Sequence, residues 1–293
     1  MEPYADRLEA AVRAKRSPLC VGIDPRLDKT PADLMAAAKG NAGAALLRFG
    51  EEIIDLVAPY AACVKPNVAF FEEHGLSGLA AYAGILKAAR RKGLLAIGDV
   101  KRGDMGATAE AYVAAHLKAG ADFETDAVTL SPYLGADSLA PWIAGAASSG
   151  KGLYVLVRTS NPGAKDLQDV ACDGGMLYER TAALVKAWGA PHLGKSGLSC
   201  VGAVVGATWP EQAKRLRALL PATPFLVPGY GAQGGTADDA APGFLPGGRG
   251  AVVNASRSIL YPKLASPDAP WREAVVAAAK KASEELDAVA RRA

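Results

Sequence analysis

The sequence contains only four cysteines and three histidines among its 293 residues, and neither type occurs in a metal-ligand motif. The cysteines include no CxxC pair, which argues against a zinc site, and the chain is too long for a disulfide-stapled mini-domain. Two of them, Cys20 and Cys63, lie within apolar runs, where we expect buried, unreactive thiols. Metal chemistry is therefore not favoured, and we expect no bound metal.

The chain also lacks a strong excess of charge. Its 33 Lys and Arg residues against 30 Asp and Glu residues give a net charge of +3, too little to suggest the concentrated basic patch of a nucleic-acid-binding protein. No uncharged run reaches 18 residues, and the N-terminal "MEPYADRLEAAVRAKRS" has no signal-peptide core. We expect a cytoplasmic protein with neither a nucleic-acid partner nor a membrane segment.

Short apolar runs are present from end to end, separated by segments with helical periodicity such as 76–92 and 209–219. Their residues are continuously apolar rather than alternating, which is typical of parallel strands buried on both faces. The predicted strands are 19–24, 61–65, 94–99, 126–131, 152–157, 201–206, 224–229 and 251–256.

Eight strands with intervening helices predict the α/β class and a (β/α)8 TIM barrel, with a doubly wound open sheet as the alternative. No Ser/Pro-rich linker divides the chain, so residues 1–293 are interpreted as a single domain. Residues 1–16 are predicted to form an additional helix that covers the bottom or edge of the barrel. Residues 188–199 are predicted to be a loop insertion before the sixth strand.

Polar side chains gather where the predicted strands end, and the C-terminal ends of barrel strands are where TIM-barrel chemistry takes place. Singly, each has an ordinary explanation: Asp24 could cap a turn, and Lys65 could extend out of a strand end. Six strand ends with such residues are much harder to explain by chance. The residues concerned are Asp24, Lys65, Asp99, Lys101, Ser160, Gln233 and Arg257.

The stretch "DVKRGD" places alternating charges directly after the third predicted strand. Asp99 and Lys101 share one face if the strand continues that far, because side chains two apart point the same way. A turn at Gly103 would bring Asp104 back towards the same lysine. Asp104 also has the alternative of capping the helix that follows.

The stretch "PGYGAQGG", residues 228–235, matches GxGxxG but follows a late strand, and Asn254 stands where a dinucleotide site needs an acid. We interpret it as a glycine loop whose amides approach a phosphate, with Arg257 supplying charge, since loops after strands seven and eight often form such a site. Residues 234–249 are predicted to be a mobile loop that closes over the phosphate. Arg249 is a weaker candidate for the phosphate arginine.

With these motifs in place, the sequence resembles the orotidine 5'-phosphate decarboxylase family over nearly its whole length, in particular its longer bacterial and archaeal branch. The resemblance is carried by Asp99-Val-Lys101-Arg-Gly-Asp104, by "VKPNVAFFEEHG" and by "VPGYGAQGG". It implies decarboxylation of orotidine 5'-monophosphate to UMP and CO2 in pyrimidine biosynthesis, with no cofactor.

The resemblance also implies a role for each matching residue. Lys65, Asp99, Lys101 and Asp104 would form an alternating charge network. Asp104 and Thr108 would reach into the site of a neighbouring subunit, which implies a homodimer. The expected substrate-binding residues are Asp24 for ribose hydroxyls, Ser160 for the pyrimidine edge, and Pro228, Gln233 and Arg257 for the closing loop and phosphate.

Two other functions stay open at this point. Magnesium-dependent sugar-phosphate decarboxylases and hexulose-phosphate synthases resemble this family and share the Asp-x-Lys-x-x-Asp element. They typically carry an acid near the position of Lys65, where a lysine would repel the metal. A catalytically silent barrel that binds a nucleotide is the second alternative, although such a protein has little reason to keep clustered charges.

Overall fold

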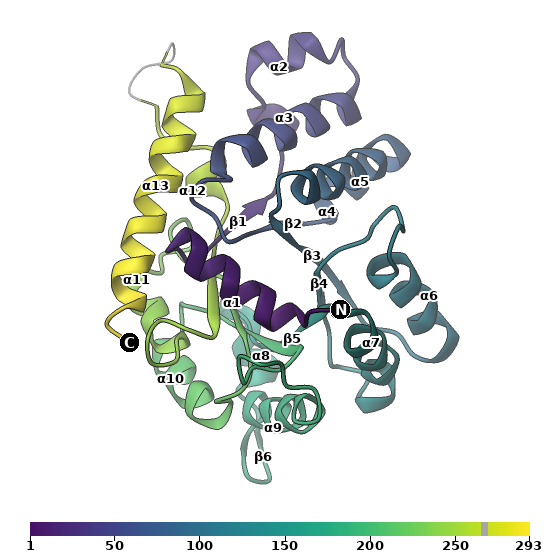
Figure 1. Cartoon of the computed structure of the whole chain (residues 1–293), viewed down its shortest axis with the longest axis vertical. Helices are drawn as coiled ribbons and strands as arrows, with labels where there is room; N and C mark the ends of the chain where they lie inside the picture. Colours follow the sequence, from purple (N-terminus) through teal and green to yellow (C-terminus); the bar gives the residue numbers. More distant parts are fainter. Residues whose placement is uncertain (265–268) are drawn as a thin grey trace.

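The computed structural model describes residues 1–264 and 269–293. Eight parallel strands close into a barrel in the order β1-β10-β9-β8-β5-β4-β3-β2, with helices around it (Figure 1). The predicted TIM barrel is therefore confirmed. The strands are β1 (Leu19–Ile23), β2 (Cys63–Pro66), β3 (Leu95–Arg102), β4 (Ala127–Leu130), β5 (Gly152–Arg158), β8 (Val201–Val205), β9 (Phe225–Val227) and β10 (Ala251–Ala255).

The helices alternate with these strands along the chain. The longer ones are α1 (Tyr4–Lys15), α3 (Ala42–Val57), α5 (Gly75–Arg91), α6 (Gly106–Leu117), α7 (Ala136–Ser149), α9 (Leu177–Gly189), α10 (Pro210–Leu219) and α13 (Trp271–Ala290). The short ones are α2 (Ala32–Ala37), α4 (Ala69–Glu72), α8 (Lys165–Gln168), α11 (Ala237–Ala240) and α12 (Arg257–Leu260), with 3-10 turns at Leu27–Lys29, Pro162–Ala164 and Ala241–Gly243.

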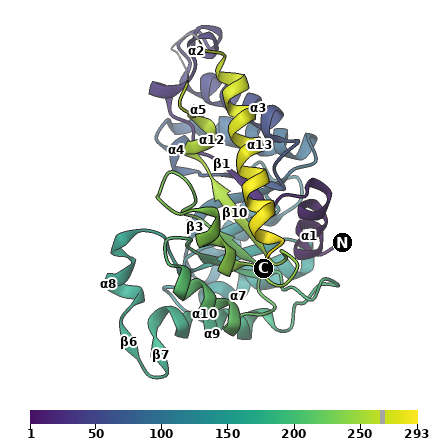
Figure 2. The ribbon, with the colours of Figure 1, turned by 90° about the vertical axis from the view of Figure 1, so that its left-hand side faces the viewer.

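The two ends of the barrel carry different additions to the basic fold. Figure 2 shows α1 on one side of the barrel and, on the other, α8 with a small hairpin of β6 (Ala171–Cys172) and β7 (Gly175–Met176). The sequence did not predict this hairpin, because strands of two residues leave no hydrophobic period. The end with α1 is the N-terminal end of the strands, so the opposite end is free for a site.

The barrel interior at the α1 end is filled with apolar side chains. Tyr4 and Leu8 of α1 are buried against it, and the Tyr4 hydroxyl lies 3.2 Å from that of Tyr154 on β5. This confirms that the N-terminal helix covers the barrel bottom. Cys20 and Cys63 are free thiols in the same cluster and are fully buried, as predicted.

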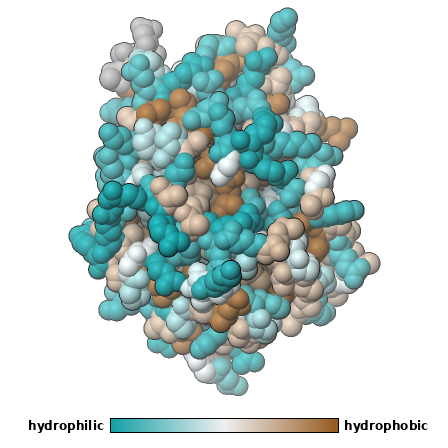
Figure 3. All heavy atoms as spheres, viewed as in Figure 1, coloured by the Kyte–Doolittle hydropathy of each residue, from teal (hydrophilic) through white to brown (hydrophobic). Residues whose placement is uncertain are grey.

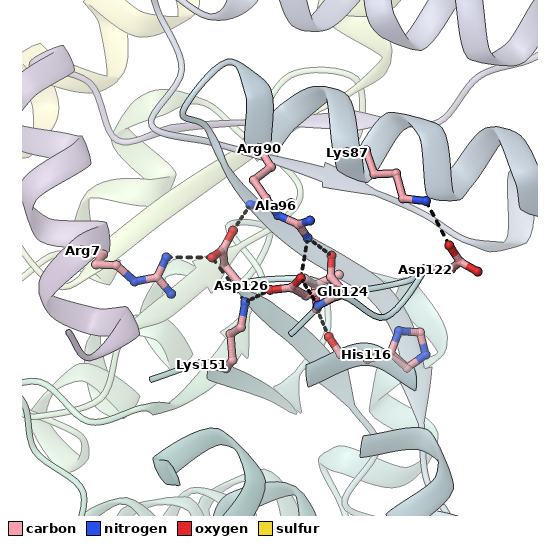
Figure 4. Close-up of polar contacts among 11 residues, drawn as sticks. Arg7, Lys87, Arg90, Ala96, His116, Asp122, Glu124, Asp126 and Lys151 are labelled. Carbon is pink, nitrogen blue, oxygen red and sulfur yellow. Dashed lines mark hydrogen bonds and ion pairs between the residues drawn. The ribbon is translucent and has the colours of Figure 1, made fainter. Parts of the chain in front are cut away.

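An ion-pair network holds α1 to the barrel (Figure 4). Arg7 donates to Asp126 at 2.7 Å, and the second oxygen of Asp126 accepts the backbone N–H of Ala96 at 2.9 Å. Lys151 donates to Glu124 at 2.9 Å beside this pair. These groups are partly buried, so water screens them less than it screens surface pairs, and they fix the helix at the closed end.

The outer face at the α1 end is mainly hydrophilic, with smaller apolar patches (Figure 3). A second core lies between the barrel and the surrounding helices, where the helices bury their apolar faces. Within residues 1–264 and 269–293, no helix combines the length and apolar character that a bilayer crossing requires.

Candidate active site

A cavity of about 490 Å³ lies at the C-terminal ends of the barrel strands. Its walls contain eight of the ten predicted catalytic and substrate-binding residues, while Asp104 and Thr108 do not line it. The eight are Asp24, Lys65, Asp99, Lys101, Ser160, Pro228, Gln233 and Arg257.

Asp99 stands between two ammonium groups in this cavity. Lys65 donates to Oδ2 of Asp99 at 2.6 Å, and Lys101 donates to Oδ1 at 2.6 Å. The side chains of Lys65 and Asp99 are 7% and 8% exposed, whereas that of Lys101 is 51% exposed. One lysine is thus a buried partner of the carboxylate, and the other presents its ammonium to the cavity.

The electrostatics of this group keep its members ionised. Burial alone would raise the pKa of Asp99, but Lys65 and Lys101 outweigh it and hold that pKa well below its usual range. Burial would likewise lower the pKa of Lys65, yet Asp99 and Asp24 raise it above its ordinary value. At neutral pH the carboxylate and the buried ammonium are therefore both charged.

The third barrel strand is long enough to carry both Asp99 and Lys101, as their predicted position on one face requires. β3 continues to Arg102, so Asp99 and Lys101 both lie on it, and their side chains meet in the cavity. The sequence pattern predicted that this strand ends at residue 99, which is three residues too early. Lys101 has a backbone φ of 43°, an unusual left-handed conformation for a lysine.

Asp104 and Thr108 do not line the cavity. Asp104 accepts a hydrogen bond from the amide of Met105 at 2.9 Å, and the turn at Gly103 does not bring it to Lys101 within this chain. Met105, not Asp104, occupies the N-cap position of α6. Thr108 is exposed on the first turn of that helix.

Asp24 follows β1 and has one oxygen directed to no protein donor. Its Oδ1 is buried, yet no residue in the described part of the chain donates a hydrogen bond to it. A buried carboxylate oxygen without a donor is costly, which makes this atom a natural acceptor for a ligand hydroxyl.

The glycine loop after β9 closes one side of the cavity. Gly229 and Gly231 have φ values of 106° and 75°, a left-handed region that other residues rarely adopt. Ser160, from the loop after β5, donates to Oε1 of Gln233 at 2.8 Å. Arg257, at the start of α12, donates to the carbonyl of Ala232 at 3.2 Å and thereby lies against the same loop.

The structure separates the two arginine candidates. Arg257 lines the cavity, whereas Arg249 donates to Glu9 at 3.2 Å and to the carbonyl of Ser196, at the end of the barrel that α1 covers. Residues 234–249 also differ from the predicted loop, because they contain α11 and a 3-10 turn. Residues 234–249 do not line the cavity, whose wall on this side is formed by residues 228–230, 232 and 233 of the glycine loop.

Several cavity residues were not identified from the sequence. Leu156, Val204 and Leu226 give it an apolar wall, and Thr129 and Asn254 add polar groups. Thr129 and Asn254 are each a polar residue inside a predicted apolar strand, a signal that could have revealed them. The three apolar residues have no such signal, because core and cavity positions of a strand look alike.

A closed parallel barrel with a charged cavity at the C-terminal ends of its strands defines a TIM-barrel enzyme. Residues 17–274 match the family described as "Orotidine 5'-phosphate decarboxylase / HUMPS family". The chain therefore belongs to this family.

Named relatives agree with this assignment over nearly the full length. The chain is 42% identical to an orotidine 5'-phosphate decarboxylase of Rhodopirellula baltica, covering 98% of this chain and 99% of the relative. It is 44% identical to one of Clostridium perfringens, covering 90% and 91%. The solved structure of Leishmania donovani OMP decarboxylase superposes with a TM-score of 0.79 at 33% identity, covering 98% of each chain.

Proposed function

We propose that this chain converts orotidine 5'-monophosphate to UMP and CO2, which makes it a carboxy-lyase. The observation that carries the proposal is the Lys65–Asp99–Lys101 charge group at the end of the barrel strands, in a chain of this family. A half-exposed ammonium held by a buried carboxylate is suited to a reaction that builds negative charge on a carbon atom.

In the proposed reaction the bond between C6 of the pyrimidine and its carboxylate breaks, and CO2 leaves. The electron pair stays on C6, where the ammonium of Lys101 stabilises it and then donates a proton. Lys101 is left as a neutral amine that takes a proton from solvent. Unit charges about 4 Å apart interact by roughly 4 kcal/mol at an effective dielectric near 20, so a fixed ammonium makes a substantial contribution.

The remaining cavity residues are proposed to hold the substrate. The free oxygen of Asp24 would accept a ribose hydroxyl, and Ser160 would contact the pyrimidine edge. Pro228, Gln233 and Arg257 would enclose the phosphate, since the first two belong to the glycine loop and Arg257 lies against it. Binding energy from the phosphate can also support closure of this loop and the exclusion of water from the reacting atoms.

The active assembly is proposed to be a homodimer in which Asp104 and Thr108 complete the partner's site. Neither residue lines the cavity of its own chain, although both follow closely in sequence on Lys101, which does. Large exposed apolar side chains occur on the two neighbouring loops: Met105, next to Asp104 in the chain, is 56% exposed, and Tyr133, on the loop after β4 that packs against Gly103 through Ser131, is 80% exposed. Exposed apolar groups gathered beside a site are typical of a subunit interface. A cytoplasmic location and independence from cofactors stay predictions.

The test follows the fall in ultraviolet absorbance of orotidine 5'-monophosphate with purified protein in EDTA. We expect rapid turnover in EDTA, because the ammonium of Lys65, which contacts Asp99, stands near the position where the magnesium-dependent enzymes carry an acid. Activity that requires magnesium and a sugar phosphate would support the magnesium-dependent enzymes instead. Binding of UMP without turnover would support a silent nucleotide-binding barrel.

A further inference from the structure

Thr129 lies on β4 opposite an irregular part of β3. The pairing between these strands shifts register between Gly98 and Arg102, so that three residues of β3 (99–101) face Thr129 alone. Strands that pair regularly match one residue to one, so β3 carries a bulge at this point. Bulges next to active sites redirect side chains, and this one contains both members of the Asp99–Lys101 pair.

The backbone of Lys101 is held by the Thr129 side chain. The N–H of Lys101 donates to the Thr129 hydroxyl oxygen at 3.0 Å. Lys101 has a φ of 43°, and a non-glycine residue keeps such a conformation only where its surroundings enforce it. The contact therefore fixes the point from which the lysine side chain starts.

The same hydroxyl also holds Asp99. It donates to Oδ1 at 2.9 Å, and this oxygen is the one that the ammonium of Lys101 contacts at 2.6 Å. The direction of both hydrogen bonds is determined. The amide of Lys101 can only donate, so the single hydrogen of the Thr129 hydroxyl is donated to the carboxylate. Thr129 is 2% exposed, so water does not compete for these bonds.

We propose that Thr129 is a positioning residue for Lys101: its hydroxyl joins the backbone of that lysine to the carboxylate that holds its ammonium. Both ends of the Lys101 side chain are thereby fixed, and Nζ is kept at one place in the cavity. The inference rests on the proposed decarboxylation, in which Lys101 must meet C6. A displacement of about 1 Å at a reacting group can cost on the order of 100-fold in rate.

The test compares Thr129→Val, which removes the hydroxyl, with Thr129→Ser, which keeps it. We expect the kcat of Thr129→Val to fall about 10- to 100-fold, with the KM for orotidine 5'-monophosphate and the Kd for UMP within about threefold of the parent. Thr129→Ser should recover the kcat. Thr125→Val is the matched control, because Thr125 is also buried and donates outside the cavity, to the carbonyl of His116.

An unchanged kcat in Thr129→Val would overturn the role of Thr129, as would an equal loss in Thr129→Ser. If thermal unfolding shows that Thr129→Val does not fold, Thr129→Ala is compared with Thr129→Ser under the same expectations. A parent protein that does not decarboxylate orotidine 5'-monophosphate would contradict the proposed function, and this role with it. An active parent with a fully active Thr129→Val contradicts the role of Thr129 alone.

Discussion

The ammonium of Lys65 lies 2.6 Å from Oδ2 of Asp99, and both side chains are more than nine-tenths buried. A buried pair of this kind is stable only while both groups are charged, since removing one charge leaves the other uncompensated. Lys101 shares the same carboxylate through its other oxygen. The free energy of unfolding should therefore depend on pH through this pair.

We expect the stabilisation by Asp99 to be lost in acid. Lys65 and Lys101 outweigh burial and lower its pKa, so its contribution is present above the unfolded pKa of about 4 and disappears as the pH falls through the lower folded value. Each unit of lowering is equivalent to about 1.4 kcal/mol. Lys65, with its raised pKa, contributes below about pH 10 and loses its effect only at higher pH.

The measurement is the free energy of unfolding between about pH 6 and pH 2 for the parent and for a Lys65→Met/Asp99→Asn double variant. The double variant removes both charges and avoids leaving one buried and unpaired. The parent should lose more stability than the variant over this interval. Parallel curves would show that the pair makes no pH-dependent contribution.

Arg257→Ala should reduce kcat/KM for orotidine 5'-monophosphate by roughly 10- to 100-fold, because hydrogen bonds to charged groups contribute about 1.5–3 kcal/mol. Its activity on orotidine, which has no phosphate, should equal that of the parent. Arg249→Ala is the matched control, since that arginine lies at the α1 end beside Glu9. A normal kcat/KM in Arg257→Ala would remove this residue from the phosphate site.

Mixing Asp104→Ala with Lys101→Ala should restore activity that neither variant has alone. If each site takes Asp104 from the partner, a mixed dimer holds one site with both residues intact. Random exchange of subunits at equal concentrations would then recover roughly a quarter of the parent activity. Activity that stays at the level of the separate variants would show that each chain completes its own site.

Arg7→Ala should lower Tm without changing kcat. The side chain of Arg7 is 25% exposed and donates to Asp126 at the closed end of the barrel (Figure 4), and it does not line the cavity. Losing a charge-assisted bond of this kind costs about 1.5–3 kcal/mol, reduced here by partial exposure, and each kcal/mol corresponds to about 2–4 °C. Arg13→Ala, an exposed position on the same helix, is the control. An unchanged Tm would mean that this network does not hold α1.

The architecture could be predicted from the sequence because its signals are local. Each barrel strand is a short apolar run, and in a parallel barrel the carboxyl ends of all strands meet at one rim. The shared rim was enough to predict that Asp24, Lys65 and Asp99 lie together, although they are distant in the chain, and all three line the cavity. The helix at the N-terminus could also be predicted, because the residues of its buried face recur at helical spacing.

The details that the sequence did not reveal depend on contacts between distant segments. The bulge in β3 and the left-handed backbone of Lys101 arise from pairing with β4, and a single strand carries no sign of its register. Arg249 lies at the α1 end of the barrel, where it pairs with Glu9, some 240 residues away in the chain. The turn at Gly103 was expected to return Asp104 to Lys101, but Asp104 instead accepts the amide of Met105 and does not line the cavity.

The most direct test of the central claim, that Lys101 supplies the proton at C6, is the turnover of orotidine 5'-monophosphate by Lys101→Ala. Lys87→Ala is the control, because Lys87 pairs with Asp122 on the surface. UMP binding, measured in parallel by calorimetry, reports whether the cavity is intact. We predict that Lys101→Ala binds UMP but loses about 10⁴-fold or more in kcat, since it lacks both the proton donor and the stabilising charge. A kcat within about tenfold of the parent would contradict the account.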